Sequence, residues 1–153
     1  MDQDPTAALL DADFLAVLRR LDKRNSATKQ KALTTLIDLL RELKEPETTG
    51  APQEYVKSED SIVSSVLPFW PRLFNSLSAD DDRRVRELAQ VAMHELARRV
   101  GRKLMPFLKE VVVSWTFCAV DAYENTARAA QRGLNETFPG KKLGELYRHF
   151  AKP

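Results

Sequence analysis

The segment Val66-Leu67-Pro68-Phe69-Trp70 recurs 38 positions later as Leu104-Met105-Pro106-Phe107-Leu108. Each copy has two apolar residues, a proline, a phenylalanine and a further apolar residue. Residues 89–93 match 130–134 at a shift of 41, with small or apolar residues in register. A period of about 40 residues with two helices per unit is typical of HEAT-type repeats. An ordinary helical bundle with prolines placed by chance is the alternative.

Apolar residues elsewhere follow helical spacing, and only five glycines interrupt the 153-residue chain. A single hairpin cannot bury its apolar face alone, so we expect about three hairpins to stack. The predicted fold is therefore all-α, an α-solenoid of about three HEAT-like helical hairpins plus a short C-terminal helix. The expected organisation is a flexible lead-in at 1–10 and a single domain at 11–153, with hairpins at about 11–43, 60–100 and 102–138, a surface loop at 44–58 and a last helix at 141–150.

Several helix boundaries follow from local signals. Ser26 is expected to cap the second helix, and Asp80-Asp81-Asp82 to begin the helix that Gly101 ends. A helix from Lys103 to about Ala119 is expected to include Phe117 in its apolar set. Pro68 and Pro106 should each kink the first helix of a pair, because proline removes a backbone donor.

The motif Pro68-Phe69-Trp70-Pro71 has the appearance of a recognition motif. Its aromatic residues nevertheless continue the apolar stripe of the helix, which favours core packing. Trp115 is interpreted in the same way. We therefore assign Pro68, Phe69, Trp70, Pro71, Pro106 and Trp115 structural roles.

Charge is distributed unevenly along the chain. Residues 1–82 carry a net charge of −5 and residues 83–153 carry +7, which points to an acidic partner surface in the second half. Solvated helix faces are the alternative explanation. The candidate partner-binding residues are Arg83, Arg84, Arg98, Arg99, Arg102 and Lys103.

The helix after residue 82 also has predicted faces. Its solvent side is expected to include Gln90 and His94 as well as arginines. Arg86 is placed on the flank, where it could bridge to Asp121 of the neighbouring repeat, a structural role.

No catalytic, metal or cofactor site is expected. Cys118 lies in an apolar run, where a thiol is buried and unreactive. His94 and His149 are far apart in sequence and neither lies beside a candidate nucleophile. Zinc motifs and glycine-rich phosphate loops are missing from the sequence. No apolar run is long enough to span a bilayer and no secretory signal is present, so the expected location is the cytosol, without a membrane partner.

Particular segments resemble the N-terminal domain of the listerin family, the RING-type E3 ubiquitin ligases of ribosome-associated quality control. The resemblance begins at 13–21 and 26–33 and continues through Val66-Leu67-Pro68-Phe69-Trp70-Pro71-Arg72 and Asp82-Arg83-Arg84-Val85-Arg86-Glu87. It then follows 104–109, Ser114-Trp115 and the alanine-rich stretch ending at Phe138-Pro139. Loop 44–58 is longer than the usual connection at this place in the family.

The resemblance implies a docking domain of an extended HEAT-repeat ligase. Its implied partners are the 60S subunit with a stalled nascent chain and a NEMF-type cofactor, with possible rRNA contact. A distant RING would recruit the E2 enzyme. One cysteine and two histidines cannot form a RING, so this chain by itself is not expected to transfer ubiquitin.

Two other functions stay open at this point. The first is a generic HEAT scaffold that binds a protein or peptide, as transport or assembly factors do. The second is the enzyme built on Cys118 or the histidines. A repeat array cut at residue 153 should also expose an apolar flank with some tendency to self-associate.

Overall fold

The computed structural model describes residues 12–43 and 63–150, and these residues form helices without any strand. The expected lead-in at 1–10 and the loop at 44–58 lie outside the described residues. The helices are α1 (Ala12–Leu21), α2 (Ser26–Glu42), α4 (Trp70–Ser78), α5 (Arg83–Val100), η2 (Gly101–Phe107, a 3₁₀ helix), α6 (Leu108–Cys118), α7 (Glu124–Thr137) and α8 (Lys141–Phe150).

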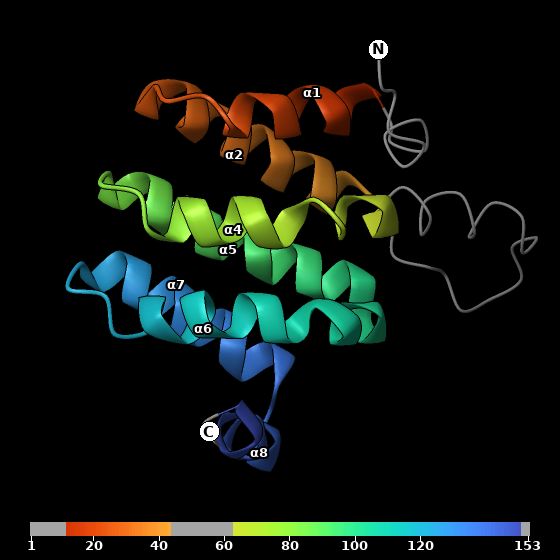
Figure 1. Ribbon diagram of the computed structural model, residues 1–153, viewed down its shortest axis with the longest axis vertical. Coiled ribbons are helices and arrows are strands. Elements are labelled where there is room, and N and C mark those ends of the chain that lie inside the picture. Colours follow the sequence, from red (N-terminus) through yellow and green to blue (C-terminus); the bar gives the residue numbers. More distant parts are fainter. Residues whose placement is uncertain (1–11, 44–62, 151–153) are drawn as a thin grey trace, which may run out of the picture.

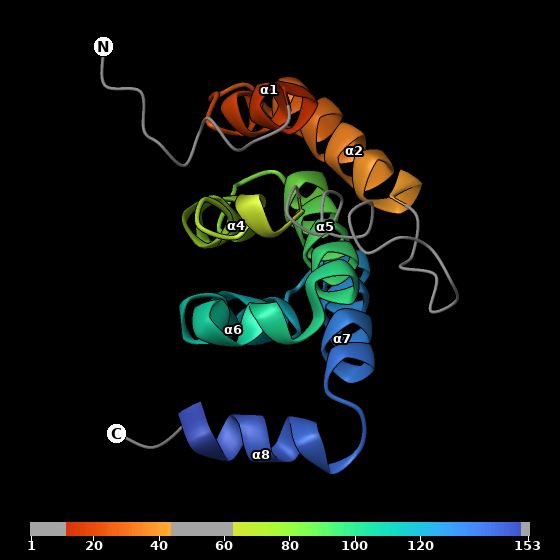
Figure 2. The same cartoon turned by 90° about the vertical axis from the view of Figure 1, so that its right-hand side faces the viewer.

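The helices pair in sequence order and the pairs stack in two layers. Helices α1, α4 and α6 form one layer, and α2, α5 and α7 form the other (Figure 1, Figure 2). The last helix behaves differently, because α8 runs across the end of the stack below α6 and α7 (Figure 2). The all-α prediction is confirmed.

Short polar residues begin two of the second-layer helices. Asn25 is the N-cap of α2, and its Oδ1 accepts the backbone N–H of Thr28 at 3.0 Å. The expectation that Ser26 caps this helix is therefore wrong by one residue. Asp82 caps α5 and accepts the N–H of Arg84 at 2.8 Å, and Gly101 (φ 54°) ends this helix as expected.

The two repeated prolines interrupt the first-layer helices at equivalent points. Residues 67–69 form a turn before α4, and Pro106 lies in η2 before α6. Phe69 and Phe107 have nearly the same backbone, with φ −94° and ψ −22° against φ −102° and ψ −6°. At both places the α-helical hydrogen bonding is interrupted, since proline cannot donate the hydrogen bond that would continue it.

The core runs through the whole stack, and the large aromatic residues lie at its centre. Trp70 and Trp115 are fully buried, while Phe69 is half-buried against the core. Trp70 donates Nε1–H to Sδ of Met93 at 3.0 Å, which joins α4 to α5. Small residues permit close contact at Gly133, where an added Cβ would lie 3.2 Å from the Trp115 ring.

Ion pairs recur between successive pairs of helices. Lys29 of α2 contacts Asp80 at 2.6 Å, and Arg86 of α5 contacts Asp121 at 2.9 Å. Each acceptor aspartate also accepts the backbone N–H two residues ahead of it, at 2.9 Å for Asp80 and 2.8 Å for Asp121. The ion pair expected between Arg86 and Asp121 is present. The position of α7 that corresponds to Lys29 and Arg86, four residues after the N-cap, is Ala127, so α7 has no cation there.

Three side chains differ from the predicted faces. Gln90 is fully buried and donates to Ser78 Oγ at 3.1 Å, and His94 is mostly covered, with its Nε2 2.8 Å from Glu136. Both were expected in solvent, but α7 packs over this side of α5 and buries it. Phe117 was expected among the apolar contacts of its helix, yet it is 76% exposed because it lies on the outer face of α6.

Candidate partner-binding surface

The six candidate basic residues lie at the two ends of α5 and just beyond it. This helix has 18 residues, so its ends are about 26 Å apart. Arg83 and Arg84 occupy the first turn, whereas Arg98, Arg99, Arg102 and Lys103 occupy the last turn and the start of η2. The structure therefore divides the expected basic surface into two groups.

The N-terminal group is engaged by its neighbours. Arg84 forms an ion pair with Glu87 at 2.7 Å. The Arg83 guanidinium lies 4.7 Å from the centre of the Tyr123 ring, which is a cation–π distance. Both residues remain exposed. The Arg83 contact joins α5 to Tyr123 at the start of α7, whereas the Arg84 pair lies within α5.

The C-terminal group contains four cations, against two in the N-terminal group. Arg98 lies 3.5 Å from Glu95, Arg99 donates Nη2–H to the carbonyl of Arg41 at 3.2 Å, and Lys103 donates to Ser64 Oγ at 3.3 Å. Nε and Nη1 of Arg99 are buried and have no hydrogen-bond acceptor among the described residues. Four cations at a helix C-terminus are also favoured by its negative dipole end.

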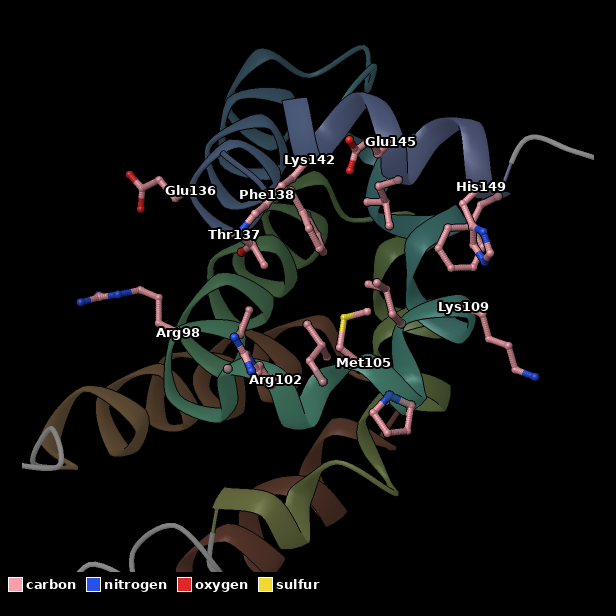
Figure 3. Close-up of a pocket in the computed structure, with 17 residues that line it drawn as sticks. Arg98, Arg102, Met105, Lys109, Glu136, Thr137, Phe138, Lys142, Glu145 and His149 are labelled. Atoms are coloured by element: carbon pink, nitrogen blue, oxygen red, sulfur yellow. The ribbon is translucent and has the colours of Figure 1, made fainter. Parts of the chain in front are cut away.

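This C-terminal group borders an apolar groove. A cavity of about 980 Å³ opens between the end of α5, η2, α6, the end of α7 and α8 (Figure 3). Met105 and Phe138 lie toward its interior, and Arg98, Glu136 and Lys109 point outward around it (Figure 3). The apolar side chains that line it are Ala97, Leu104, Met105, Pro106, Leu108, Phe138, Leu146 and Phe150.

The other candidate chemistry has a structural explanation. Cys118 is buried, and burial raises the pKa of its thiol above the ordinary value, which disfavours the reactive thiolate. His94 pairs with Glu136, and the exposed ring of His149 packs edge-on against Phe150. Within residues 12–43 and 63–150, no group of three possible metal ligands comes together. In the same ranges no helix has the length and apolar content that crossing a bilayer requires.

The groove was not predicted as a site, although part of its signal is in the sequence. Leu143, Leu146 and Phe150 follow one another at spacings of three and four, the apolar stripe of an amphipathic helix. The direction in which α8 crosses the stack could not be obtained from that spacing, because it depends on the turn at Pro139-Gly140 and on the shape of the flank.

Comparisons with known proteins agree with one another. The family model for the N-terminal domain of E3 ubiquitin-protein ligase listerin matches residues 9–153. The listerin of Gallus gallus is 36% identical over 138 residues, as is that of Mus musculus, and each match covers 90% of this chain. The listerin of Drosophila melanogaster is 28% identical over 137 residues. This chain spans about 7% of the length of these relatives. No solved structure matches the chain significantly.

Proposed function

Because the chain belongs to the listerin family and carries the family's N-terminal domain, we propose that it docks a listerin-type E3 ligase on stalled 60S subunits. In this proposal the domain binds the subunit that carries a stalled nascent chain, together with a NEMF-type cofactor. A RING elsewhere in the ligase, working with its E2 enzyme, then ubiquitinates the nascent chain. The proposed location is the cytosol.

The basic C-terminal end of α5 is the observation that carries the proposal. Residues 83–153 have a net charge of +7, and four of these cations lie together at Arg98, Arg99, Arg102 and Lys103. Ribosomal surfaces present rRNA phosphates and acidic protein segments, and each phosphate neutralised by a cation contributes to affinity.

The rigid stack explains how a docking domain could position a distant catalytic module. The ion pairs from Lys29 to Asp80 and from Arg86 to Asp121 join successive helix pairs, and one core passes through all of them. A surface held in this way keeps its geometry when a partner binds, so the remainder of a long ligase would be presented at a defined place.

The test is co-sedimentation of the purified domain with 60S–nascent-chain complexes, with and without the NEMF-type cofactor. We expect Arg102→Glu with Lys103→Glu to weaken binding by about tenfold or more at low salt and to flatten its salt dependence. Arg19→Glu with Arg20→Glu, which also reverses two cations but at the exposed end of α1, is the matched control and should bind nearly as the wild type does.

Two results would reject the proposal. The first is no binding above that of a charge-scrambled control protein. The second is a variant with Arg102→Glu and Lys103→Glu that binds as tightly as the wild type at every salt concentration. Direct contact with rRNA is tested separately, by photo-crosslinking from position 102 to either RNA or protein.

A further inference from the structure

The turn between α1 and α2 differs from the two other turns that lead into a second-layer helix. It carries the sequence Lys23-Arg24-Asn25-Ser26, so two cations occupy the third and second positions before a serine. The residue after the N-cap is Ser26 in α2 but Arg83 in α5 and Glu124 in α7. Of these three helices, α2 is therefore the one that begins with a hydroxyl group preceded by two cations.

The basic pair and the serine lie at the surface. Residues 22–25 are exposed and lie outside the helices, and the backbone of Asn25 is extended, with φ −72° and ψ 123°. Ser26 is half-buried at the first position of α2, where a helix frays and opens most readily. Protein kinases select their substrates in part by charge, and two cations at these positions are the pattern that basic-directed serine kinases recognise.

The Ser26 side chain faces an acidic neighbour in the next helix pair. It donates a hydrogen bond to the carboxylate of Asp82, and this contact does most to lower the pKa of Asp82 below the ordinary value for aspartate. Gln30 donates to the same carboxylate at 3.1 Å. Three residues after Ser26, Lys29 Nζ lies 2.6 Å from Asp80. The hydroxyl group therefore belongs to the contact that joins α2 to the start of α5.

We propose that Ser26 is a phosphorylation site for a basic-directed serine kinase and that its phosphate loosens the contact between α2 and α5. In this reaction the γ-phosphorus of ATP forms a bond to Oγ of Ser26, and its bond to the oxygen that bridges it to the β-phosphate breaks. ADP leaves, and the hydroxyl proton passes to the catalytic aspartate of the kinase. This modification goes beyond ribosome docking and does not depend on it.

Charge determines the direction of the effect. A phosphoserine carries a charge of about −1.5 to −2 near pH 7, so phosphorylation replaces a donor to Asp82 with a second anion beside it. The phosphate also lies three residues before Lys29, a spacing at which side chains of a helix meet, and it competes with Asp80 for the ammonium group. A phosphate in the first turn favours the positive end of the α2 dipole, but that interaction acts within α2 and does not hold α2 against α5.

The first experiment measures phosphate transfer. The purified domain is incubated with ATP and the catalytic subunit of cyclic-AMP-dependent protein kinase, and fragmentation mass spectrometry locates the phosphate, which we expect on Ser26. Lys23→Ala with Arg24→Ala should lower the rate at this serine by at least about tenfold. Arg19→Ala with Arg20→Ala removes two exposed cations of α1 instead and should change the rate by less than about twofold. Phosphate only at other positions, or equal rates for the two paired variants, would overturn the assignment.

The second experiment compares hydrogen exchange in the phosphorylated and unmodified domains. Amides of α1 and α2 should exchange about tenfold faster after phosphorylation, because a hairpin released from α5 loses the packing that protects it, while α6 and α7 keep their rates. Asp82→Asn retains a capping side chain and removes the facing charge, so the acceleration should be smaller in this variant.

Three results of the exchange experiment contradict the proposal. They are unchanged rates in α1 and α2, equal acceleration in all the helices, and an acceleration that Asp82→Asn leaves intact. No ribosome is present in these assays, so their failure leaves the docking proposal unaffected.

Discussion

Residues 66–70 and 104–108 are two copies of one sequence pattern in two different surroundings. In the first copy Leu67 is buried inside the stack, whereas in the second Met105 is exposed inside a groove. The two regions also differ in their ion pairs. Arg86 of α5 forms an ion pair with Asp121, whereas α7 has Ala127 at the equivalent position and forms no such pair there. The local sequence sets the backbone of both copies, and the neighbouring helices determine which one is closed.

The largest expected effect comes from placing a charge at the two equivalent apolar positions. Leu67→Asp should reduce the free energy of unfolding by more than about 4 kcal/mol, because the carboxylate would be buried without a partner. Met105→Asp should change it by less than about 1 kcal/mol, since the side chain stays in water. Urea denaturation followed by circular dichroism measures both, and equal losses would show that the two copies do not differ as described.

Removal of the ion pair between Arg86 and Asp121, which joins successive helix pairs, should have the next largest effect. Arg86→Ala leaves the mostly buried carboxylate of Asp121 unpaired and removes a donor to the carbonyl of Asp80 at 2.9 Å. We expect a loss of about 3 kcal/mol in the free energy of unfolding. Arg128→Ala is the control, because its pair with Glu124 is exposed and should contribute less than about 0.5 kcal/mol. A similar loss of unfolding free energy in both variants would show that the ion pair between Arg86 and Asp121 stabilises the fold no more than an exposed pair does.

Acid should weaken the same ion pair between Arg86 and Asp121. The hydrogen bonds from Arg86 lower the pKa of Asp121 below the ordinary value for aspartate, and the N–H of Tyr123 contributes to that decrease. A lowered pKa in the folded state means that this stabilisation is complete above about pH 4 and is lost as the pH falls through the folded-state pKa. Asp121→Asn should therefore show a shallower acid dependence of stability than the wild type in urea titrations from neutral pH downward. Parallel curves would exclude this source of acid sensitivity.

The smallest effect is expected at the open flank. Leu146→Ala removes the one buried side chain of α8, and α8 can detach without unfolding the stack behind it. We expect hydrogen exchange of the α8 amides to accelerate by about tenfold, while the global free energy of unfolding falls by less than about 1 kcal/mol. Faster exchange in α5 and α7 as well would indicate that α8 is an integral part of the core.

Much of the fold could be predicted from residue patterns. The apolar stripes located the helices, the aspartates at 80–82 and Gly101 located the ends of α5, and the alignment of 66–70 with 104–108 predicted two equivalent kinks. Arg86 and Asp121 could be paired in advance because the repeat places a flanking cation opposite the next turn. Gln90 and His94 were misplaced, because a helical projection around one apolar arc cannot tell that α7 covers a second side of α5.

The candidate surface was less accessible to prediction than the fold. Six basic residues close in sequence were expected to form one surface, but a helix of 18 residues separates them into two groups about 26 Å apart. The groove depends on residues from five elements between Ala97 and Phe150, and no local pattern brings them together.

By itself, the amino-acid sequence determined the helices, their order, the proline breaks and the listerin family, because each follows from local hydrogen bonding, apolar periodicity or motif identity. Only the tertiary structure decided that Leu67 is closed and Met105 open, and that the cations at the end of α5 border an apolar groove. The physical reason is that burial and local charge are properties of a neighbourhood. Here that neighbourhood is set by how α8 crosses the flank of the stack.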